Sequence, residues 1–422
     1  MTGAAPHSVA ACSALSTRSR MARRHNGEGS IYPYRNGFAA YVWIVTPDGR
    51  RQRKYVYGKS RQAVHEKWLA MTAASRRAPV APTHPRLSEY LERWLNESVR
   101  PNLAPQTVAH YEFFSRAYID PDLGSKRIDR LTVRDVRLWM NDLRVRCQCC
   151  AQGKDARRRK PKCCAIGLCC RQIASEWTRH QAWTVLQSAL TAAVRDELVS
   201  RNVAALIKVP VPRAHRALVW TVEEARTFLE SARAASDPFY AAYVLMLVLG
   251  LRRGEILGLA WSEVDLEARE ALIAWQLQRV SGRLLRRETK TAASDAALPL
   301  PEICVRALEG RLELEGRLRS QAEAWHESGL VITTKLGKPV DPRNFYRAFQ
   351  TRCRRAGVPT TTVHATRKAC ASLLVALDVH PRVAMQILRH SQIAVTMDVY
   401  SQVTSDSTLR ALKALGERLE GH

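Results

Sequence analysis

Proline-rich sequence interrupts the 422-residue chain twice, at residues 78–85 and 209–212. Proline fixes φ and has no backbone N–H to donate, so neither stretch continues a helix or enters the middle of a sheet. With 46% hydrophobic residues, the chain can bury two or three ordinary cores. We therefore expect separately folded segments at residues 29–77, 86–208 and 217–404.

The charge balance points to a polyanionic partner. The chain has 66 lysines and arginines against 39 acidic residues, for a formal net charge of +27. Such an excess is typical of proteins that bind nucleic acid. The longest purely apolar stretch, near residues 241–251, is too short to span a bilayer, so we expect no membrane partner.

The first residues are rich in Ala, Ser and Thr, and their arginines follow the weakly apolar part, which is the reverse of a secretory signal. We expect a disordered leader over residues 1–28 and a cytoplasmic protein associated with the nucleoid. Met21 is an alternative start to Met1.

Residues 29–77 predict three strands and a covering helix. Strands are expected at residues 31–34, 38–44 and 52–56, with Asn-Gly and Pro-Asp-Gly turns between them, and Ser60 is expected to cap the helix. Alternation puts Tyr41 and Trp43 on one face of the middle strand and the aliphatic side chains on the other. DNA-binding residues are expected among the basic side chains of this segment: Arg35, Arg50, Arg51, Arg53 and Lys54. The alternative is a small oligomerisation module.

Residues 86–208 have the apolar periodicity of four or five helices. The pattern covers residues 87–95, 107–118, 132–143 and 173–198. A Cys-rich insertion at residues 146–171 interrupts it, with seven cysteines and eight lysines and arginines. In a cytoplasmic chain this density favours a structural Zn²⁺ ion over disulfides. We expect Cys147 and Cys150 to bind it with one residue each from Cys163/Cys164 and Cys169/Cys170, and choose Cys163 and Cys169. A loop with redox-sensitive thiols is the alternative.

Four short motifs in residues 217–404 have chemistry in common. An apolar run ends in Gly250-Leu-Arg252-x-Gly-Glu255, and Lys290 follows an expected β-hairpin turning at Ser281-Gly282. Next come His364-Ala-Thr-Arg367, whose His and Arg are expected to share a helix face, and His390 ten residues before Tyr400. A tyrosine can attack phosphorus, arginines can hold a phosphate, and lysine and histidine can move protons. Taken singly, each residue would more often be structural.

Together, in this order, the motifs resemble the signature of tyrosine recombinases, specifically phage-type integrases of actinobacterial style. The resemblance implies a multidomain protein that is mainly α with small β parts. Its segments would be an arm-type DNA-binding domain (29–77), a helical core-binding domain (86–208), a mixed α/β catalytic domain (217–404) and a C-terminal helical tail (405–422).

The same resemblance implies roles for particular residues. Arg252 and Arg367 would clamp the scissile phosphate, Lys290 would be the general acid, and Tyr400 the nucleophile. The remaining implied residues are His364 and His390 in proton transfer, with Glu255 in support. Arg389 stands where the family commonly has glycine, which is a departure from the pattern.

The implied activity is site-specific recombination through a 3′-phosphotyrosine, which integrates or excises a mobile element without a catalytic cofactor. Its partners would be double-stranded DNA attachment sites, a homotetramer of the chain on DNA, and an excision or host architectural factor. Two alternatives are a catalytically inactive DNA-binding regulator and a type IB topoisomerase-like strand transferase.

Overall fold

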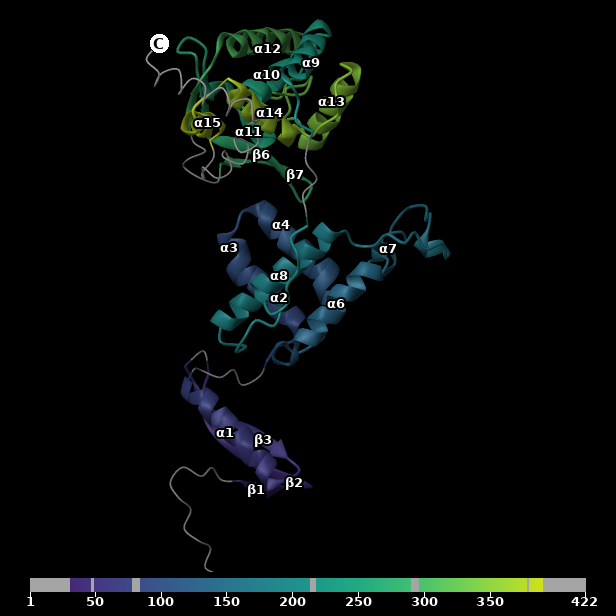
Figure 1. Ribbon diagram of the computed structural model, residues 1–422, viewed down its shortest axis with the longest axis vertical. Coiled ribbons are helices and arrows are strands. Elements are labelled where there is room, and N and C mark those ends of the chain that lie inside the picture. Colours follow the sequence, from purple (N-terminus) through teal and green to yellow (C-terminus); the bar gives the residue numbers. More distant parts are fainter. Residues whose placement is uncertain are drawn as a thin grey trace, which may run out of the picture. The chain divides into compact units, whose positions relative to one another are not determined.

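The computed structural model describes residues 31–46, 49–77, 84–212, 218–289, 296–377 and 379–389. The expected leader, the C-terminal tail and the catalytic candidates Lys290, His390 and Tyr400 lie outside these ranges. By Cα proximity the chain divides into two units, residues 1–94 with 114–210 and residues 95–113 with 211–422. Figure 1 shows the elements, which are taken here one segment at a time.

The first segment is an antiparallel sheet covered by one helix. Its elements are β1 (Tyr32–Tyr34), β2 (Gly37–Val45), β3 (Arg51–Gly58) and α1 (Arg61–Arg77). Helix α1 lies along the sheet (Figure 1), and Val64 packs against Ala40 and Val56. The Ser60 side chain accepts the backbone N–H of Ala63 at 3.2 Å, which is the predicted cap. The predicted three strands and helix are confirmed.

The second segment is helical, as predicted. Its main elements are α2 (Leu87–Trp94), η1 (Leu95–Val99), α3 (Arg100–Asn102), α4 (Pro105–Phe114), η2 (Ser115–Ile119), α5 (Asp120–Leu123), η3 (Ile128–Arg130), α6 (Val133–Val145) and α8 (Glu176–Arg195). Thr132 and Asp135 form a capping box that starts α6. The expected helix start at Ile173 is wrong, because Ser175 caps α8 and Ile173 is exposed.

The insertion leaves α6 and returns to α8 with little regular structure. It contains α7 (Gln148–Ala151) and η4 (Cys164–Ile166). The backbone N–H of Gln148 donates to the carbonyl of Gln172 at 2.7 Å, which closes the base of the insertion. Its apolar side chains do not form a core, since Ile166 and Leu168 are exposed.

The third segment combines helices with two small sheets. Its helices are α9 (Val222–Ala234), α10 (Tyr240–Val248), α11 (Arg253–Gly258), η5 (Trp261–Glu263), α12 (Glu302–Gln321), α13 (Pro342–Arg355), α14 (Val363–Ala376) and α15 (Pro381–Leu388). Its strands are β4 (Val264–Asp265), β5 (Glu270–Ile273), β6 (Trp275–Val280), β7 (Arg283–Glu288) and β8 (Ala296–Pro299). An aromatic cluster of Trp220, Phe228, Tyr243, Phe345 and Phe349 lies at its centre, with each side chain at most 2% exposed.

The predicted hairpin at Ser281-Gly282 is present, and both turn residues have positive φ. The apolar run before it is not one strand, however. It breaks at Ala274, whose carbonyl accepts the N–H of Thr289. Strand β5 pairs with β4 and β8, whereas β6 pairs with β7 in a separate sheet of the described residues. Among the described residues no helix is both long and apolar enough to cross a membrane.

Gly258 allows α11 to approach β6, and this contact gives a stability prediction. A Cβ at this position would lie 2.7 Å from the backbone carbon of Gln276. We expect Gly258→Ala to lower the free energy of unfolding by about 1–3 kcal/mol, because the backbones must separate. Gly310 on the exposed side of α12 has open space around it, so Gly310→Ala is expected to stabilise by about 0.5–1 kcal/mol. Urea denaturation of both variants measures the difference, and equal effects would contradict the close-approach argument.

Candidate active site and its arginine cluster

Arg252 stands at a sharp turn between two apolar helices. Gly250 has φ +59°, and a Cβ there would meet Leu388 at 2.7 Å, so the turn requires glycine. Arg252 is the N-cap of α11, with its side chain 40% exposed. The turn therefore directs the Arg252 side chain away from the core.

Glu255 links Arg252 to a second arginine. Its carboxylate accepts the backbone N–H of Arg252 at 2.8 Å and the Arg252 guanidinium at 2.6 Å. It also accepts the guanidinium of Arg389, and the side chains of this second pair are 1% and 3% exposed. A buried carboxylate therefore holds two cations and one end of a helix.

Arg389 explains the departure noted in the sequence. It has φ 51° and ψ 51° at the C-cap of α15, a conformation that glycine adopts freely. For a residue with a Cβ this conformation costs about 1–2 kcal/mol. From this position the Arg389 guanidinium reaches Glu255, so the arginine belongs to the cluster. Arg389 was not among the site residues expected from the motifs, although a cation at a glycine position was a visible signal.

Arg367 lies beside this group and is 4% exposed. Its Nη1 donates to the carbonyl of Gly250 at 2.6 Å, whereas its buried Nη2 has no partner among the described residues. Burial and the nearby guanidinium of Arg252 lower the pKa of Arg367 to about 9. An anion placed beside Nη2 would raise that pKa again, because it favours the charged form of the guanidinium.

His364 precedes Arg367 on α14, but the two side chains differ in burial. The His364 side chain is exposed and lines a pocket with Arg252, Gln276 and Tyr346. Partial desolvation and the cationic Arg367 and Lys368 lower the pKa of His364. The imidazole is therefore neutral at pH 7, as a proton acceptor must be. Both residues lie on α14 three positions apart, as expected, and they differ in that Arg367 is buried whereas His364 is exposed.

The arrangement is suited to binding one anion. Three guanidinium groups gather around a single carboxylate, and buried nitrogens of Arg367 and Arg389 lack partners among the described residues. Buried cations without partners are costly, so an oxyanion that supplied the missing acceptors would be held strongly. Lys290, His390 and Tyr400 lie outside the described residues.

The open face of the first sheet is aromatic and basic. Tyr34, Tyr41, Trp43, Tyr55 and Tyr57 lie on it. Arg53 stacks over Trp43 at 4.8 Å and over Tyr41 at 4.9 Å, and Arg51 lies 5.5 Å from Trp43. Arg35 stacks on Tyr34 in the same way, at 5.4 Å.

The remaining two basic candidates of this segment are placed differently. Lys54 is the cross-strand partner of Val42, so it lies on the face that α1 covers. Arg50 lies in the turn before β3, where its carbonyl accepts the N–H and the hydroxyl of Thr46. Three of the five candidates therefore share the open face. Alternation along β3 would have assigned Lys54 correctly.

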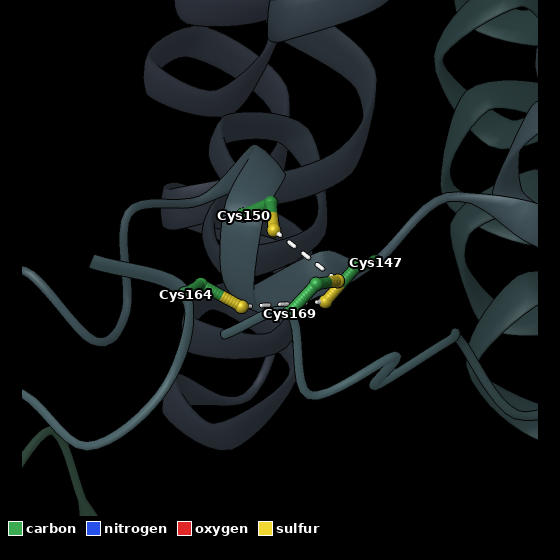
Figure 2. A group of neighbouring side chains, drawn as sticks. All are labelled: Cys147, Cys150, Cys164 and Cys169. Atoms are coloured by element: carbon green, nitrogen blue, oxygen red, sulfur yellow. Dashed lines mark hydrogen bonds between the residues drawn. The ribbon is translucent and has the colours of Figure 1, made fainter. Parts of the chain in front are cut away.

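The insertion brings its cysteine sulfurs together. Cys147, Cys150, Cys164 and Cys169 form one group in which all Sγ atoms lie within 4.8 Å of one another. Figure 2 shows these four side chains converging from α7 and from the returning loop. Cys149, Cys163, Cys164 and Cys170 form a second such group. The structure thus places Cys164, where Cys163 was expected, beside Cys147, Cys150 and Cys169.

Asp155 fixes the loop that carries two of these cysteines. It is 1% exposed and accepts the backbone N–H groups of Lys162, Cys163 and Ala165 at 3.0, 2.8 and 3.1 Å. These hydrogen bonds, that of Lys162 above all, lower the pKa of Asp155 to about 2. The carboxylate therefore stays ionised and fixes the loop around Cys163.

The Glu255 pairs generate a prediction about stability. Glu255→Gln keeps the side-chain shape but leaves Arg389 buried without a counter-charge, so we expect a loss of about 3–5 kcal/mol in the free energy of unfolding. Glu223→Gln breaks an exposed pair with Arg226 and is expected to cost about 0.5 kcal/mol or less. Urea denaturation with and without sulfate provides the measurement. Sulfate should stabilise Glu255→Gln more than the control, and similar losses in both variants would refute the central role of Glu255.

Two family models match the chain. The phage integrase family matches residues 219–406, and the phage integrase N-terminal SAM-like domain matches residues 86–144. Among curated relatives, a tyrosine recombinase XerC-like protein of Caldanaerobacter subterraneus is 24% identical, covering 91% of this chain and 97% of the relative. An integrase of Streptomyces ambofaciens is 26% identical, covering 90% and 93%.

Solved structures show the same fold. The Tn1549 transposon integrase in complex with transposon right end DNA has a TM-score of 0.61 at 20% identity, covering 78% of this chain and 99% of that one. A lambda integrase dimer bound to a COC′ core site has a TM-score of 0.51 at 15% identity, covering 89% and 96%. The multidomain, mainly helical fold expected from the motifs is thereby confirmed. The chain belongs to the phage integrase family and is a tyrosine recombinase.

Proposed function

We propose that this recombinase integrates or excises a mobile element at specific DNA sites, and that the arginine cluster holds the scissile phosphate. The observation that supports the proposal is the gathering of Arg252, Arg367 and Arg389 around Glu255. Three cations balanced by one carboxylate leave an excess of positive charge, which a phosphodiester would neutralise. The two relatives are named a tyrosine recombinase XerC-like protein and an integrase, which agrees with this activity.

The arginines would contribute mainly in the transition state. Attack on phosphorus places additional negative charge on the non-bridging oxygens, and preorganised guanidinium groups stabilise that charge without reorganising. Arg252 is exposed enough to reach a phosphate, and Arg367 Nη2 is the buried donor that lacks a partner. Glu255 and Arg389 are positioning residues, because they hold Arg252 and the end of α15 in place.

The strand exchange itself would proceed through Tyr400. Its phenolic oxygen forms a bond to phosphorus while the bond to the 5′ oxygen breaks, leaving a 3′-phosphotyrosine. Lys290 donates a proton to the leaving 5′ oxygen, and His364 and His390 take up or share the tyrosyl proton. A 5′ hydroxyl from another duplex then attacks the phosphotyrosine and releases Tyr400. The bond energy is retained throughout, so no nucleotide hydrolysis is needed.

The aromatic and basic face of the first sheet would bind arm-type DNA. Arginines stacked on Tyr and Trp rings keep their remaining donors free for phosphates and base edges. The face is broad and is not covered by α1. The alternative of an oligomerisation module fits less well, because the stacked arginines would repel a second copy of the same face.

The wider assembly follows from the activity. Exchange of four strands requires four nucleophiles, so we propose a homotetramer on double-stranded attachment sites in the nucleoid. An excision or host architectural factor would determine whether the recombinase integrates or excises the element. The three folded segments would correspond to arm-type binding, core-site binding and catalysis, with the boundaries given from the sequence.

The Cys-rich insertion would hold structural Zn²⁺. Its thiolates are the ligands that zinc prefers, and its apolar side chains do not supply a core. Zinc bound there would hold the insertion folded, whereas catalysis would need no cofactor.

A nicked suicide duplex tests the catalytic proposal. The wild-type chain is expected to form a covalent protein–DNA adduct in EDTA, visible on denaturing gels, and Tyr400→Phe is expected to bind DNA without trapping it. Tyr240→Phe, a partly buried tyrosine of α10, is the matched control and should trap normally. Arg252→Ala should slow trapping by about 10²–10³-fold, because one charge-stabilising group is lost.

The outcomes of this assay separate the alternatives. An adduct in Tyr400→Phe would refute the nucleophile assignment. Binding without any wild-type adduct would favour the inactive regulator, and relaxation of supercoils without strand exchange would favour the topoisomerase-like enzyme. A parallel reaction with added Zn²⁺ controls for unfolding of the insertion by EDTA.

The arm face is tested through salt dependence. Arg53→Gln should weaken binding of the full chain to element-end DNA and reduce the slope of log K against log salt by about 0.9, the value for one phosphate contact. Arg61→Gln, at the exposed start of α1, changes the same charge away from the open face. Fluorescence anisotropy at several salt concentrations provides the slopes. Equal slopes for the two variants would exclude a specific role for the open face.

A further inference from the structure

We propose that the Cys-rich insertion binds two Zn²⁺ ions through seven thiolates, with Cys164 bridging the ions. This inference deepens the zinc-binding proposal above and is independent of the recombination chemistry. Two four-coordinate ions that share one ligand need seven thiolates, and the insertion has seven cysteines. All seven are free, and all seven belong to one of the two sulfur groups.

The sulfur spacing fits tetrahedral zinc. The Sγ atoms of Cys164 and Cys170 are 3.6 Å apart, and those of Cys150 and Cys169 are 3.7 Å apart. The distances for Cys147–Cys164 and Cys149–Cys163 are 3.8 and 3.9 Å. A Zn–S bond of about 2.3 Å with tetrahedral angles puts neighbouring sulfurs about 3.8 Å apart. A disulfide would need sulfurs only about 2.05 Å apart.

Cys164 is the one residue common to both groups, and its position agrees with a bridge. It lies in η4, between the loop fixed by Asp155 and the irregular return that carries Cys169 and Cys170. The backbone N–H of Cys170 points to Cys164 Sγ at 3.5 Å. Cys147 and Cys170 also lie 3.8 Å apart, so the two groups are contiguous through Cys164 and its neighbours.

A single ion would leave three of the clustered cysteines without a ligand role. One ion could use only one group, and three thiols of the other group would remain within 4.8 Å of Cys164 with no ligand role. Of the insertion's residues only Cys147, Gln148, Cys149 and Asp155 are buried, so sulfur contacts are its main internal packing. Loops without an apolar core depend on such staples.

The charge of a two-ion cluster also suits its setting. Seven thiolates and two divalent ions have a net charge of about −3. Eight lysines and arginines lie in residues 146–171, against the single acidic residue Asp155. The basic side chains can offset the cluster charge and still leave the insertion positive toward DNA.

The test is metal stoichiometry in the full-length protein, purified without chelator. Elemental analysis against quantitative amino-acid analysis is expected to give two zinc ions per chain. After exchange to ¹¹³Cd, NMR is expected to show two tetrathiolate resonances coupled to each other through the shared sulfur. One ion per chain, or two resonances without coupling, would overturn the shared cluster. No bound ion would overturn the structural zinc as well.

Single substitutions locate the bridge. Cys169→Ser should weaken one site and Cys149→Ser the other, each leaving one tightly bound ion per chain. Cys164→Ser should weaken both and abolish the cadmium coupling, because it removes a ligand from each ion. Cys304→Ala, at a buried position of α12 outside the insertion, is the matched control and should retain two ions. If Cys164→Ser behaved like Cys169→Ser, the bridging assignment would be wrong.

Discussion

The charge balance at Glu255 is the constraint on which the catalytic segment depends. One buried carboxylate accepts hydrogen bonds from the backbone N–H of Arg252 at the start of α11, from the Arg252 guanidinium and from the Arg389 guanidinium. Residues 252 and 389 are far apart in sequence. The Glu255 side chain therefore connects the turn between α10 and α11 to the end of α15. Removing this carboxylate would leave the buried guanidinium groups without a counter-charge in a low-dielectric interior, where they repel one another.

The carboxylate of Glu255 does not neutralise all the positive charge around it. Arg367 is buried beside Arg252, and its free Nη2 has no acceptor in the described part of the chain. A fully neutralised cluster would be more stable but would have no affinity left for a phosphodiester. If the cluster binds the scissile phosphate as proposed, the surplus of guanidinium over carboxylate is both a cost to the free protein and a source of binding energy for DNA.

Sequence reasoning located those parts of the site that local structure determines. Arg252 and Glu255 are three residues apart at a glycine turn, so their pairing follows from helix geometry. Arg389 escaped it because its partner lies 134 residues away, and only the fold brings them together. The fold class followed from ordered motifs and periodicity, while the break at Ala274 depended on which strand each half pairs with.

The choice between Cys163 and Cys164 shows a second limit of the same kind. The spacings of Cys163 and Cys164 from every other cysteine differ by only one position, so ligand spacing does not separate them. The structure separates them through Asp155, whose hydrogen bonds to the backbone of Cys163 and Ala165 set the loop direction. The direction of a side chain in an irregular loop depends on such contacts, which are invisible to periodicity.

Three of the described parts of the chain place positive charge beside three different kinds of group. In the first sheet aromatic rings stack on the arginines, in the catalytic segment a carboxylate holds them, and in the proposed zinc cluster of the insertion thiolates would lie among the lysines and arginines. Ring faces restrain a guanidinium without neutralising it, whereas a carboxylate neutralises one charge outright. With a net charge of +27, full neutralisation would remove the attraction for DNA. Without any compensation, repulsion between the basic side chains would destabilise the folded state. Partial compensation at each site reconciles a folded protein with a strongly anionic substrate.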